Sequence, residues 1–308
     1  MSGEVWKSIT LEEAIEFRNG KSSPERKDTG FNPVFGSNGI IGYTEESNSE
    51  LETIIIGRVG AYCGSVYYHH GKCWVTDNAI IGKVKPYYDG SYLFYLLKII
   101  DLNSHRAGSS QPLINQSILN SIQVTVPLRK ATQTRIAAIL SALDNKIELN
   151  HQTNATLEGI AQAIFKEWFV DFRFPGATDE MQDSELGPIP KGWRVGRLGD
   201  ILGFKNGKAS PERDDTYDYQ VYGANGIIGC ANSYNSTEKN IVIGRVGSFC
   251  GAVYLPLTKI WITDNSIIAE PKAEKTTIFC FILLKQIHLN TYKTGSGQPL
   301  LNQNILNP

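Results

Sequence analysis

The longest regular pattern of apolar positions in the chain lies between about residues 132 and 172. These positions advance by alternating steps of four and three residues, the spacing of a helix that pairs with another helix along a narrow seam. At about 1.5 Å per residue, such a helix is roughly 60 Å long. We therefore predict a coiled-coil spacer in preference to an ordinary amphipathic core helix. The seam consists of Ile136, Leu140, Leu143, Ile147, Asn150, Asn154, Leu157, Ala161, Ile164 and Trp168.

Two of the seam positions are amides, Asn150 and Asn154. An amide in a helix-pairing seam costs stability but fixes the register and orientation of the partner helix. The pattern thus predicts pairing with a defined partner, in addition to simple burial of an apolar stripe.

Apolar runs before this helix are short and bounded by glycine-rich turns. Valine, isoleucine and aromatic residues between such turns favour strands, and we predict strands at 53–56, 64–68, 73–84 and 121–126. Helical patterns are confined to residues 11–17 and 92–100, with a further short segment at 115–119. These elements predict a β-rich domain of the α+β class.

The same pattern occurs twice in the chain. EFRNGKSSPER (16–26) matches GFKNGKASPER (203–213), and IIGRVGAYCG (55–64) matches VIGRVGSFCG (242–251). VFGSNGIIG, WVTDNAII and GSSQPLINQ of the first half also have counterparts in the second, all at an offset of 187 residues. We infer a tandem duplication of a whole domain. The predicted parts are domain one at 1–127, the spacer helix at 128–174, a linker at 175–192 and domain two at 193–308.

Bulk composition narrows the functional classes only slightly. The chain of 308 residues carries 30 basic and 31 acidic residues, so any basic surface must be local. Its five cysteines show no zinc-ligand spacing, and we expect reduced, mostly buried thiols in a cytoplasmic protein. No apolar run is long enough to span a bilayer, and we expect no membrane partner.

Motifs for catalysis are missing from the sequence. It contains no phosphate-binding GxxxxGK loop, no GxSxG and no HExxH, and its five histidines are scattered. A nuclease-like cluster around Glu25, Arg26 and Lys27 loses its lysine in the second copy, which has Asp214 there. We therefore expect a binding protein without a catalytic or metal site, and without a cofactor of its own.

The loops shared by the two copies are rich in Lys, Arg, Asn, Gln, Ser and Gly. These residue types contact DNA phosphates and base edges. Arg58 and Arg245 follow a predicted strand between glycines that allow a ligand close to the backbone, although a tight turn with a surface arginine is the alternative. The candidate DNA-binding residues are Lys21, Arg26, Asn38, Arg58, Ser109, Gln111, Lys208, Arg213, Asn225, Arg245, Ser296 and Gln298.

Some residues near these loops have a second interpretation. Asn38 and Asn225 precede glycine and fit a hairpin turn better than a base contact. Tyr62 and Phe249 are expected in the sheet core. Asp77–Asn78 and Asp264–Asn265 interrupt an apolar run and either satisfy each other in a turn or contact a base.

A rigid helix between two similar readers would set the distance between two DNA half-sites. Because the copies are so alike, we predict two similar half-sites in an interrupted inverted repeat.

At this point the chain resembles the specificity subunits of type I restriction–modification systems. The resemblance rests on LGPIPKGWRVGRLGD (186–200), GSGQPLLNQ (295–303) with its twin at 108–116, and IFKEWFVDFRF (164–174). It implies two target recognition domains separated by helices that pair antiparallel, a bipartite target on double-stranded DNA, and no catalysis in this chain. Methyltransferase subunits would bind the helices and modify adenine with S-adenosylmethionine, and endonuclease subunits requiring ATP and Mg²⁺ would join them.

The sequence departs from this pattern in one respect, because no second long helix follows the second copy. We therefore expect the seam from Ile136 to Trp168 to pair with a second copy of the chain, or with a fragment or subunit outside it. The alternative function is a protein-interaction scaffold. The salt dependence of binding distinguishes a DNA-binding subunit from a protein-interaction scaffold, because binding through phosphates weakens steeply as the salt concentration rises.

Overall fold

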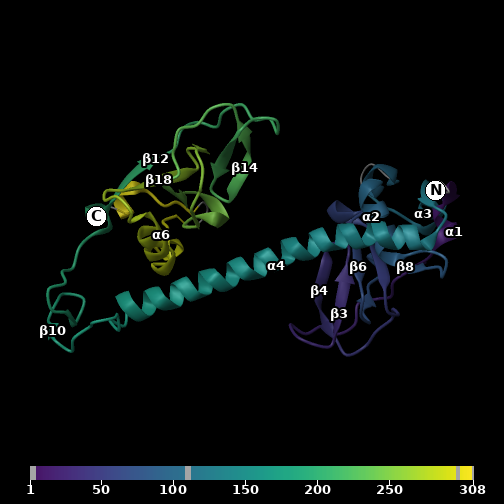
Figure 1. The fold of residues 1–308 in the computed structure, drawn as a ribbon, viewed down its shortest axis with the longest axis horizontal. Coiled ribbons are helices and arrows are strands. Elements are labelled where there is room, and N and C mark those ends of the chain that lie inside the picture. The colour runs from purple at the N-terminus through teal and green to yellow at the C-terminus, as the bar shows by residue number, and fades with distance from the viewer. Residues whose placement is uncertain (1–4, 108–111, 296–298, 307–308) are drawn as a thin grey trace. The chain divides into compact units, whose positions relative to one another are not determined.

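The computed structural model describes residues 5–107, 112–295 and 299–306 (Figure 1). Contacts divide the chain into two compact units, unit 1 (Met1–His151) and unit 2 (Gln152–Pro308). The division falls inside helix α4 (Lys130–Phe169), which is continuous over 40 residues and contributes to both units. The fold is therefore two β-rich α+β domains separated in sequence by one long helix.

The described residues of unit 1 form three antiparallel or mixed sheets and short helices. The four-stranded sheet has the order β2-β8-β5-β6, the three-stranded sheet β4-β3-β7, and β1 pairs with β9. Its elements before α4 are β1 (Trp6–Thr10), α1 (Leu11–Ala14), β2 (Ile15–Asn19), β3 (Asn32–Gly36), β4 (Gly39–Thr44), β5 (Thr53–Gly57), η1 (Gly60–Tyr62), β6 (Val66–His69), β7 (Trp74–Val75), β8 (Ala79–Val84), α2 (Gly90–Ile99), η2 (Leu102–His105), α3 (Gln116–Ser121) and β9 (Gln123–Pro127).

Unit 2 repeats this topology, with sheets β12-β18-β15-β16 and β14-β13-β17 and a small β10-β11 hairpin. Its elements are β10 (Met181–Gln182), β11 (Ile189–Pro190), α5 (Leu198–Ile201), β12 (Leu202–Asn206), β13 (Tyr219–Gly223), β14 (Gly226–Ala231), β15 (Ile241–Gly244), η3 (Gly247–Phe249), β16 (Val253–Tyr254), β17 (Trp261–Ile262), β18 (Ser266–Pro271), α6 (Thr277–Gln286), η4 (Leu289–Tyr292) and α7 (Gln303–Leu306).

The strand registers of the two units match at the offset read from the sequence. Ile15 pairs with Val84 in unit 1, and Leu202 pairs with Pro271 in unit 2, so both partners are shifted by 187 residues. These registers confirm the predicted duplication in the four-stranded sheets.

The four-stranded sheet of unit 1 is buried on both faces, which explains its continuous apolar strand β5. Ile54 and Ile56 point into a core formed with α2 and α3, whereas Ile55 points to the opposite face, toward Phe35 of the three-stranded sheet. Unit 2 is built in the same way, with Ile241 and Ile243 on one face and Val242 on the other.

Three predicted elements differ from the structure, one of them the strand predicted at 73–84, which a turn at 77–78 divides into β7 and β8 of different sheets. Residues 11–17 were expected to be helical, but helix α1 ends at Ala14 and strand β2 follows, because Ile15 and Phe17 alternate with exposed neighbours and pair with β8. The spacer helix predicted at 128–174 spans only Lys130–Phe169, and Phe172 beyond it adopts a left-handed φ of 57° that cannot continue a right-handed helix.

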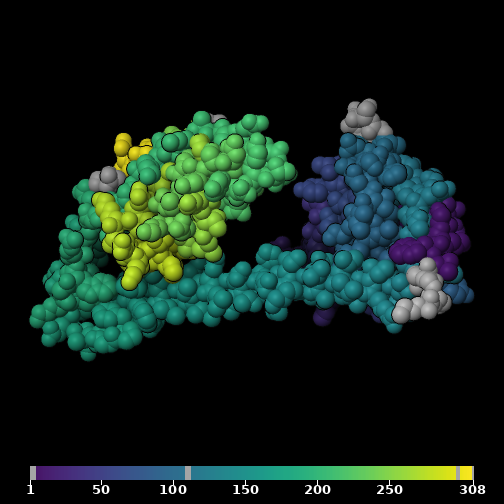
Figure 2. All heavy atoms as spheres, turned by 45° about the horizontal axis from the view of Figure 1, so that its top comes forward, coloured from purple at the N-terminus to yellow at the C-terminus, as the bar shows by residue number. Residues whose placement is uncertain are grey.

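Helix α4 packs on unit 1 through its first turns and on unit 2 through its last. Ala137 is buried in the core of unit 1, and Phe165 is buried in unit 2, where its ring lies 5.4 Å from that of Phe279. Between these ends, in the teal stretch of Figure 2, Leu143 and Leu157 have exposed fractions of 59% and 58%, whereas Leu140 and Ala161 are half-buried. Helix pairing through them stays a prediction.

The cysteines are free thiols, four of them buried and Cys230 half-buried. Within residues 5–107, 112–295 and 299–306, no cluster of three or more potential metal ligands occurs. Among the same residues, none of the helices combines the length and apolar character needed to cross a membrane.

Candidate nucleic-acid interface

The loops shared by the two copies converge at one end of each unit. In unit 1, the N–H of Lys21 donates to the carbonyl of Val75, and the N–H of Arg58 donates to that of Asn78. The hydroxyl of Ser37 also donates to the carbonyl of Asn78, and the carbonyl of Arg58 accepts from the N–H of Ile114. Segments far apart in the sequence therefore form one cluster, which we call the motif cluster (residues 20–21, 37–38, 57–59, 76–78 and 113–114).

Glycine permits the backbones of this cluster to approach each other. A Cβ atom on Gly20 would overlap the carbonyl oxygen of Thr76, and one on Gly57 would lie 2.7 Å from that of Ser37. In unit 2, a Cβ atom on Gly207 or Gly244 would approach the equivalent carbonyl oxygens just as closely. The glycines next to the candidate residues are thus required by the packing of the loops.

Arg58 and Arg245 occupy equivalent, half-buried positions in the two motif clusters. Nη1 of Arg58 donates to the carbonyl of Asp77 at 3.2 Å, and Nη1 of Arg245 donates to that of Asp264 at 3.0 Å. Each guanidinium carries five N–H donors, and each Nε is buried without a hydrogen-bond partner in the part of the chain that the structure describes. The turn carbonyl therefore orients the guanidinium, and its other Nη donors remain available to an acceptor such as a base edge or a phosphate.

The turn that holds this arginine does so through its backbone. The carbonyls of Asp77 and Asn78 accept from Arg58, and both side chains are exposed. The sequence left open a turn role and a base contact for these residues. The chain does turn at these residues, through backbone carbonyls bonded to Arg58, and a base contact by the exposed side chains stays a prediction.

The structure places the other candidates at different sites. Lys21 is exposed and forms a backbone bridge with Thr76 inside the motif cluster, as Lys208 does with Thr263. Asn38 lies in the β3–β4 hairpin turn before Gly39, whose φ is 95°, and Asn225 has the same place before Gly226.

Arg26 and Arg213 are not drawn into the motif cluster. Arg26 lies against Gly42 of β4 and donates to the carbonyl of Ile41 at 3.4 Å. Arg213 donates to the carbonyl of Ile228 at 2.7 Å. Both side chains brace the long loop on the hairpin, although they are exposed and still able to reach a phosphate.

Four candidates, Ser109, Gln111, Ser296 and Gln298, lie outside the described residues. The residues that flank the first pair are placed next to the arginine. Ala107 and Leu113 exchange backbone hydrogen bonds, and Leu113 also bridges to Val59. Thr294, Leu300 and Val246 repeat this arrangement in unit 2.

The prediction that Tyr62 and Phe249 belong to the sheet core was wrong. They are 55% and 52% exposed, because each ends a short 3-10 turn that follows the arginine loop and leaves the sheet. Ile40 and Ile227, next to the hairpin turns, are exposed to 52% and 53% and were not singled out. The sequence did contain a signal that Tyr62 leaves the sheet, because Gly60 and Gly64 interrupt the strand pattern on either side of it.

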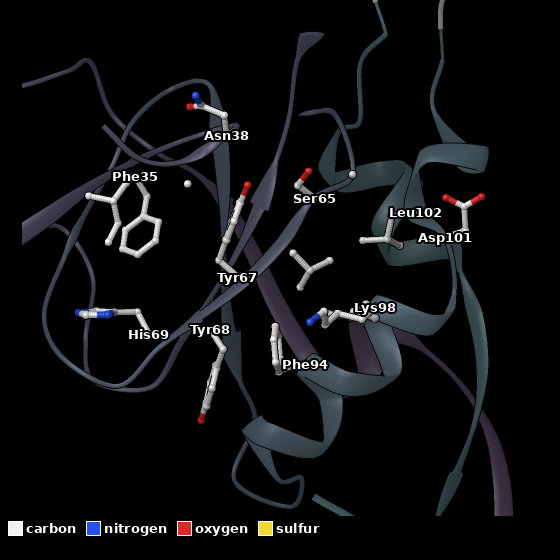
Figure 3. A pocket seen from close by; sticks show the side chains of 15 residues that line it. Phe35, Asn38, Ser65, Tyr67, Tyr68, His69, Phe94, Lys98, Asp101 and Leu102 are labelled. Atoms are coloured by element: carbon white, nitrogen blue, oxygen red, sulfur yellow. The ribbon is translucent and has the colours of Figure 1, made fainter. Parts of the chain in front are cut away.

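A groove of about 900 Å³ runs beside the motif cluster of unit 1 (Figure 3). Asn38 stands at one end, Tyr67 and Phe94 lie along it, and Asp101 lies at the far end from Phe35. Nζ of Lys98 lies 5.0 Å from the centroid of the Phe94 ring, a cation–π contact that Lys285 and Phe281 repeat at 5.0 Å in unit 2. The equivalent groove of unit 2 is smaller, about 300 Å³.

His69 occupies a half-buried place in this groove, with its ring 5.5 Å from that of Phe35. Burial lowers the pKa of His69, because the imidazolium loses hydration there. Unit 2 has Pro256 at the equivalent position. The two grooves therefore share a frame but differ in side chains.

The chain is similar in sequence to one family of known proteins. A family model described as the type I restriction modification DNA specificity domain matches residues 3–159 and 190–307. The specificity subunit of the type I restriction enzyme MjaIX from Methanocaldococcus jannaschii is 38% identical over 129 residues, 40% of this chain and 29% of that protein. That of EcoprrI from Escherichia coli is 34% identical over 144 residues, 45% of this chain and 36% of that protein. These matches thus span about a third of the curated relatives.

A solved structure shows the same fold. The crystal structure of a type I restriction–modification S subunit from M. genitalium superposes with a TM-score of 0.61 at 19% sequence identity, covering 94% of this chain and 78% of that one. The two β-rich domains and the long helix between them in sequence are therefore an architecture already seen in an S subunit.

Proposed function

The chain belongs to the family of type I restriction–modification DNA specificity domains, and we propose that it is a specificity subunit that reads a bipartite target on double-stranded DNA. The observation that supports the proposal most directly is the repeated motif cluster. Each unit holds one half-buried arginine against a turn carbonyl, with donors left over. Two such readers on one chain fit two half-sites.

Each motif cluster offers the contacts that DNA recognition needs. An arginine with free Nη donors can bind the O6 and N7 acceptors of guanine in a bidentate manner, or a phosphate. The exposed Lys21 and Lys208 are suited to phosphates, and Asn38 and Asn225 lie at hairpin tips. Tyr62 and Phe249 add exposed aromatic surface close to these donors. The two half-sites are proposed to be similar and inverted, because the frames are equivalent.

Chemistry on DNA is assigned to partner subunits. In this proposal methyltransferase subunits bind the long helix and modify the target with S-adenosylmethionine, and endonuclease subunits use ATP and Mg²⁺. The chain itself is proposed to be non-catalytic and cytoplasmic. Its role is to bind and position DNA, so its own residues move no proton and form no covalent bond.

The open seam of α4 is proposed as the pairing surface. Leu143, Ile147 and Leu157 are more than half exposed on α4, whose side-chain hydrogen bonds to the rest of each unit extend inward as far as Asp144 and Glu158. Apolar side chains at a/d spacing are stabilised when a second helix covers them. The partner is proposed to be a second copy of the chain or a helix of another subunit.

The test is selection from a randomised DNA library by the chain in complex with methyltransferase subunits, followed by sequencing. The proposal expects a split motif with a fixed gap, and an affinity that falls steeply between about 50 and 200 mM salt. Binding that is insensitive to salt and enriches no motif would instead favour the protein-interaction scaffold. The double variant Arg58→Ala with Arg245→Ala removes both central donors. It therefore serves as the control that shows whether binding depends on the two motif clusters.

A further inference from the structure

The two units share one unusual backbone corner that carries different side chains. After α2 the chain turns through Asp101 with a φ of 51°, and after α6 it turns through His288 with a φ of 53°. Side chains other than glycine rarely adopt this left-handed region, where Asp, Asn and His are enriched. Both residues are exposed, and within residues 5–107, 112–295 and 299–306 neither side chain makes a hydrogen bond or an ion pair.

The corner is fixed against the arginine loop. A Cβ on Gly64 would lie 2.7 Å from the backbone nitrogen of Asn103, so the segment after Asp101 packs directly on the loop that follows Arg58. Gly251 meets Asn290 in the same way in unit 2. Asp101 and His288 thus have equivalent positions relative to Arg58 and Arg245.

The same corner lines the groove beside the motif cluster. Asp101 lines the groove of unit 1 together with Asn38 and Lys98 (Figure 3), and His288 lines that of unit 2 together with Lys285. One helical turn before the corner, Lys98 and Lys285 rest on equivalent phenylalanine rings. A common cation thus precedes a side chain that differs.

The difference is one of hydrogen-bonding chemistry. An ionised carboxylate only accepts hydrogen bonds, whereas a histidine ring always carries at least one N–H donor. In the major groove, cytosine N4 and adenine N6 are donors, and guanine O6 and N7 are acceptors. A carboxylate therefore favours a base with an amino group, and an imidazole can favour guanine.

We propose that Asp101 and His288 are equivalent specificity-determining residues, through which the two units read a different base pair at one position of otherwise similar half-sites. This inference rests on the proposed function. Asp101 is assigned an amino-bearing base, cytosine or adenine, and His288 is assigned guanine. Lys98 is assigned the neighbouring phosphate in the half-site of unit 1, whereas Nζ of Lys285 forms an ion pair with Glu158 at 2.8 Å.

The experiment exchanges the two side chains. Complexes with methyltransferase subunits are made with the wild-type chain and with Asp101→His, His288→Asp and both changes together, and each selects from the randomised library. Asp101→His is expected to change one position of a single half-site to the base that the other half-site has there, with a preference changed by roughly 10- to 100-fold. His288→Asp is expected to give the reciprocal change, and the double variant to exchange the two bases.

Controls separate folding from recognition. Asp179→His places the same substitution on an exposed linker aspartate and is expected to leave the motif unchanged. Asp101→Asn keeps a residue suited to the left-handed corner but adds a donor, so it should relax the preference at the same position. Circular dichroism shows which variants fold.

Two results would overturn the inference in different ways. If the wild-type complex enriches a split motif and folded Asp101→Asn and His288→Asp variants enrich the identical motif, the assignment of these residues is wrong while the proposed function stands. If the wild-type complex enriches no motif, the proposed function itself fails.

Discussion

Trp193 and Phe174 stack with their ring centroids 5.5 Å apart and their planes 16° from parallel. Phe172 meets the same indole edge-on at 5.5 Å, and Phe169 at the end of α4 lies 6.1 Å away. The residues after the long helix therefore fold back onto the first residue of the second repeat. Trp6, the repeat counterpart of Trp193, is 53% exposed.

This aromatic cluster makes a stability prediction. Trp193→Ala removes three ring contacts of about 0.5–1.5 kcal/mol each beyond area burial, so it should lower the free energy of unfolding of unit 2 by about 2–3 kcal/mol. Trp6→Ala is the matched control and should cost about 0.5 kcal/mol. Denaturant unfolding followed by circular dichroism measures both. Equal losses in the two variants would contradict the prediction.

Two glycines should respond to alanine in opposite directions. Gly20→Ala forces a methyl group onto the carbonyls of Val75 and Thr76, and should destabilise unit 1 by at least about 1–3 kcal/mol while disturbing the motif cluster. Gly159→Ala meets no atom within 4 Å on helix α4, and should stabilise the helix by about 0.5–1 kcal/mol. Thermal unfolding of the two variants checks both signs. A Gly20→Ala protein as stable as the wild type would show that the loops do not meet as described.

Arg58 is expected to dominate recognition by unit 1. Arg58→Ala should weaken DNA binding by about 1–3 kcal/mol. If the arginine reads a base, the variant relaxes specificity at one position. If it binds a phosphate, the slope of log affinity against log salt decreases by about one instead.

Arg58→Lys and Arg194→Ala sharpen this test. Lysine keeps the charge but loses the planar fork, so it should rescue a phosphate contact better than a base contact. Arg194 is exposed outside the motif cluster, and its change to alanine should alter affinity less than threefold. Binding titrations at several salt concentrations distinguish these outcomes. An Arg58→Ala variant with wild-type affinity and motif would remove this residue from the interface.

The α4 seam predicts the state of association. Leu143→Glu with Ile147→Glu places two charges where a partner helix would cover them, so it should abolish helix pairing while each unit stays folded. Asn145→Glu adds a charge on the outer face of the same helix and should leave pairing intact. Sedimentation of the chain alone, and of the chain with methyltransferase subunits, gives the masses. Pairing that survives the double variant would exclude the seam.

His69 predicts a pH dependence of unit 1. Burial lowers its pKa below the 6.5 of a free side chain, so the unfolded chain binds the proton at a higher pH than the folded protein does. Stability from this group is therefore fully present above about pH 6.5 and is lost as the pH falls from there through the lower pKa of the folded state. His69→Gln should reduce the loss of stability between pH 7.5 and 5. An NMR titration of His69 with a midpoint at or above 6.5 would refute the argument.

Sequence reasoning was most successful where a local pattern has one structural solution. The 187-residue offset fixed equivalent registers such as Ile15–Val84 and Leu202–Pro271, because strand pairing repeats when the alternation of side chains repeats. It failed for Tyr62 and for residues 15–17. An aromatic next to a strand has the same local signature whether the chain continues in the sheet or leaves it, and a short apolar segment fits a helix or a strand.

The sequence by itself thus determined the duplication, the long helix and the family, all of which depend on spacing along the chain. Only the tertiary structure decided which loops meet. The bond from Arg58 to Asp77, and the groove that Asn38 and Asp101 both line, bring together residues separated by many positions. Such contacts form because the sheet brings two distant loops to the same end of the domain. The residues within one loop do not reveal which other loop it will contact.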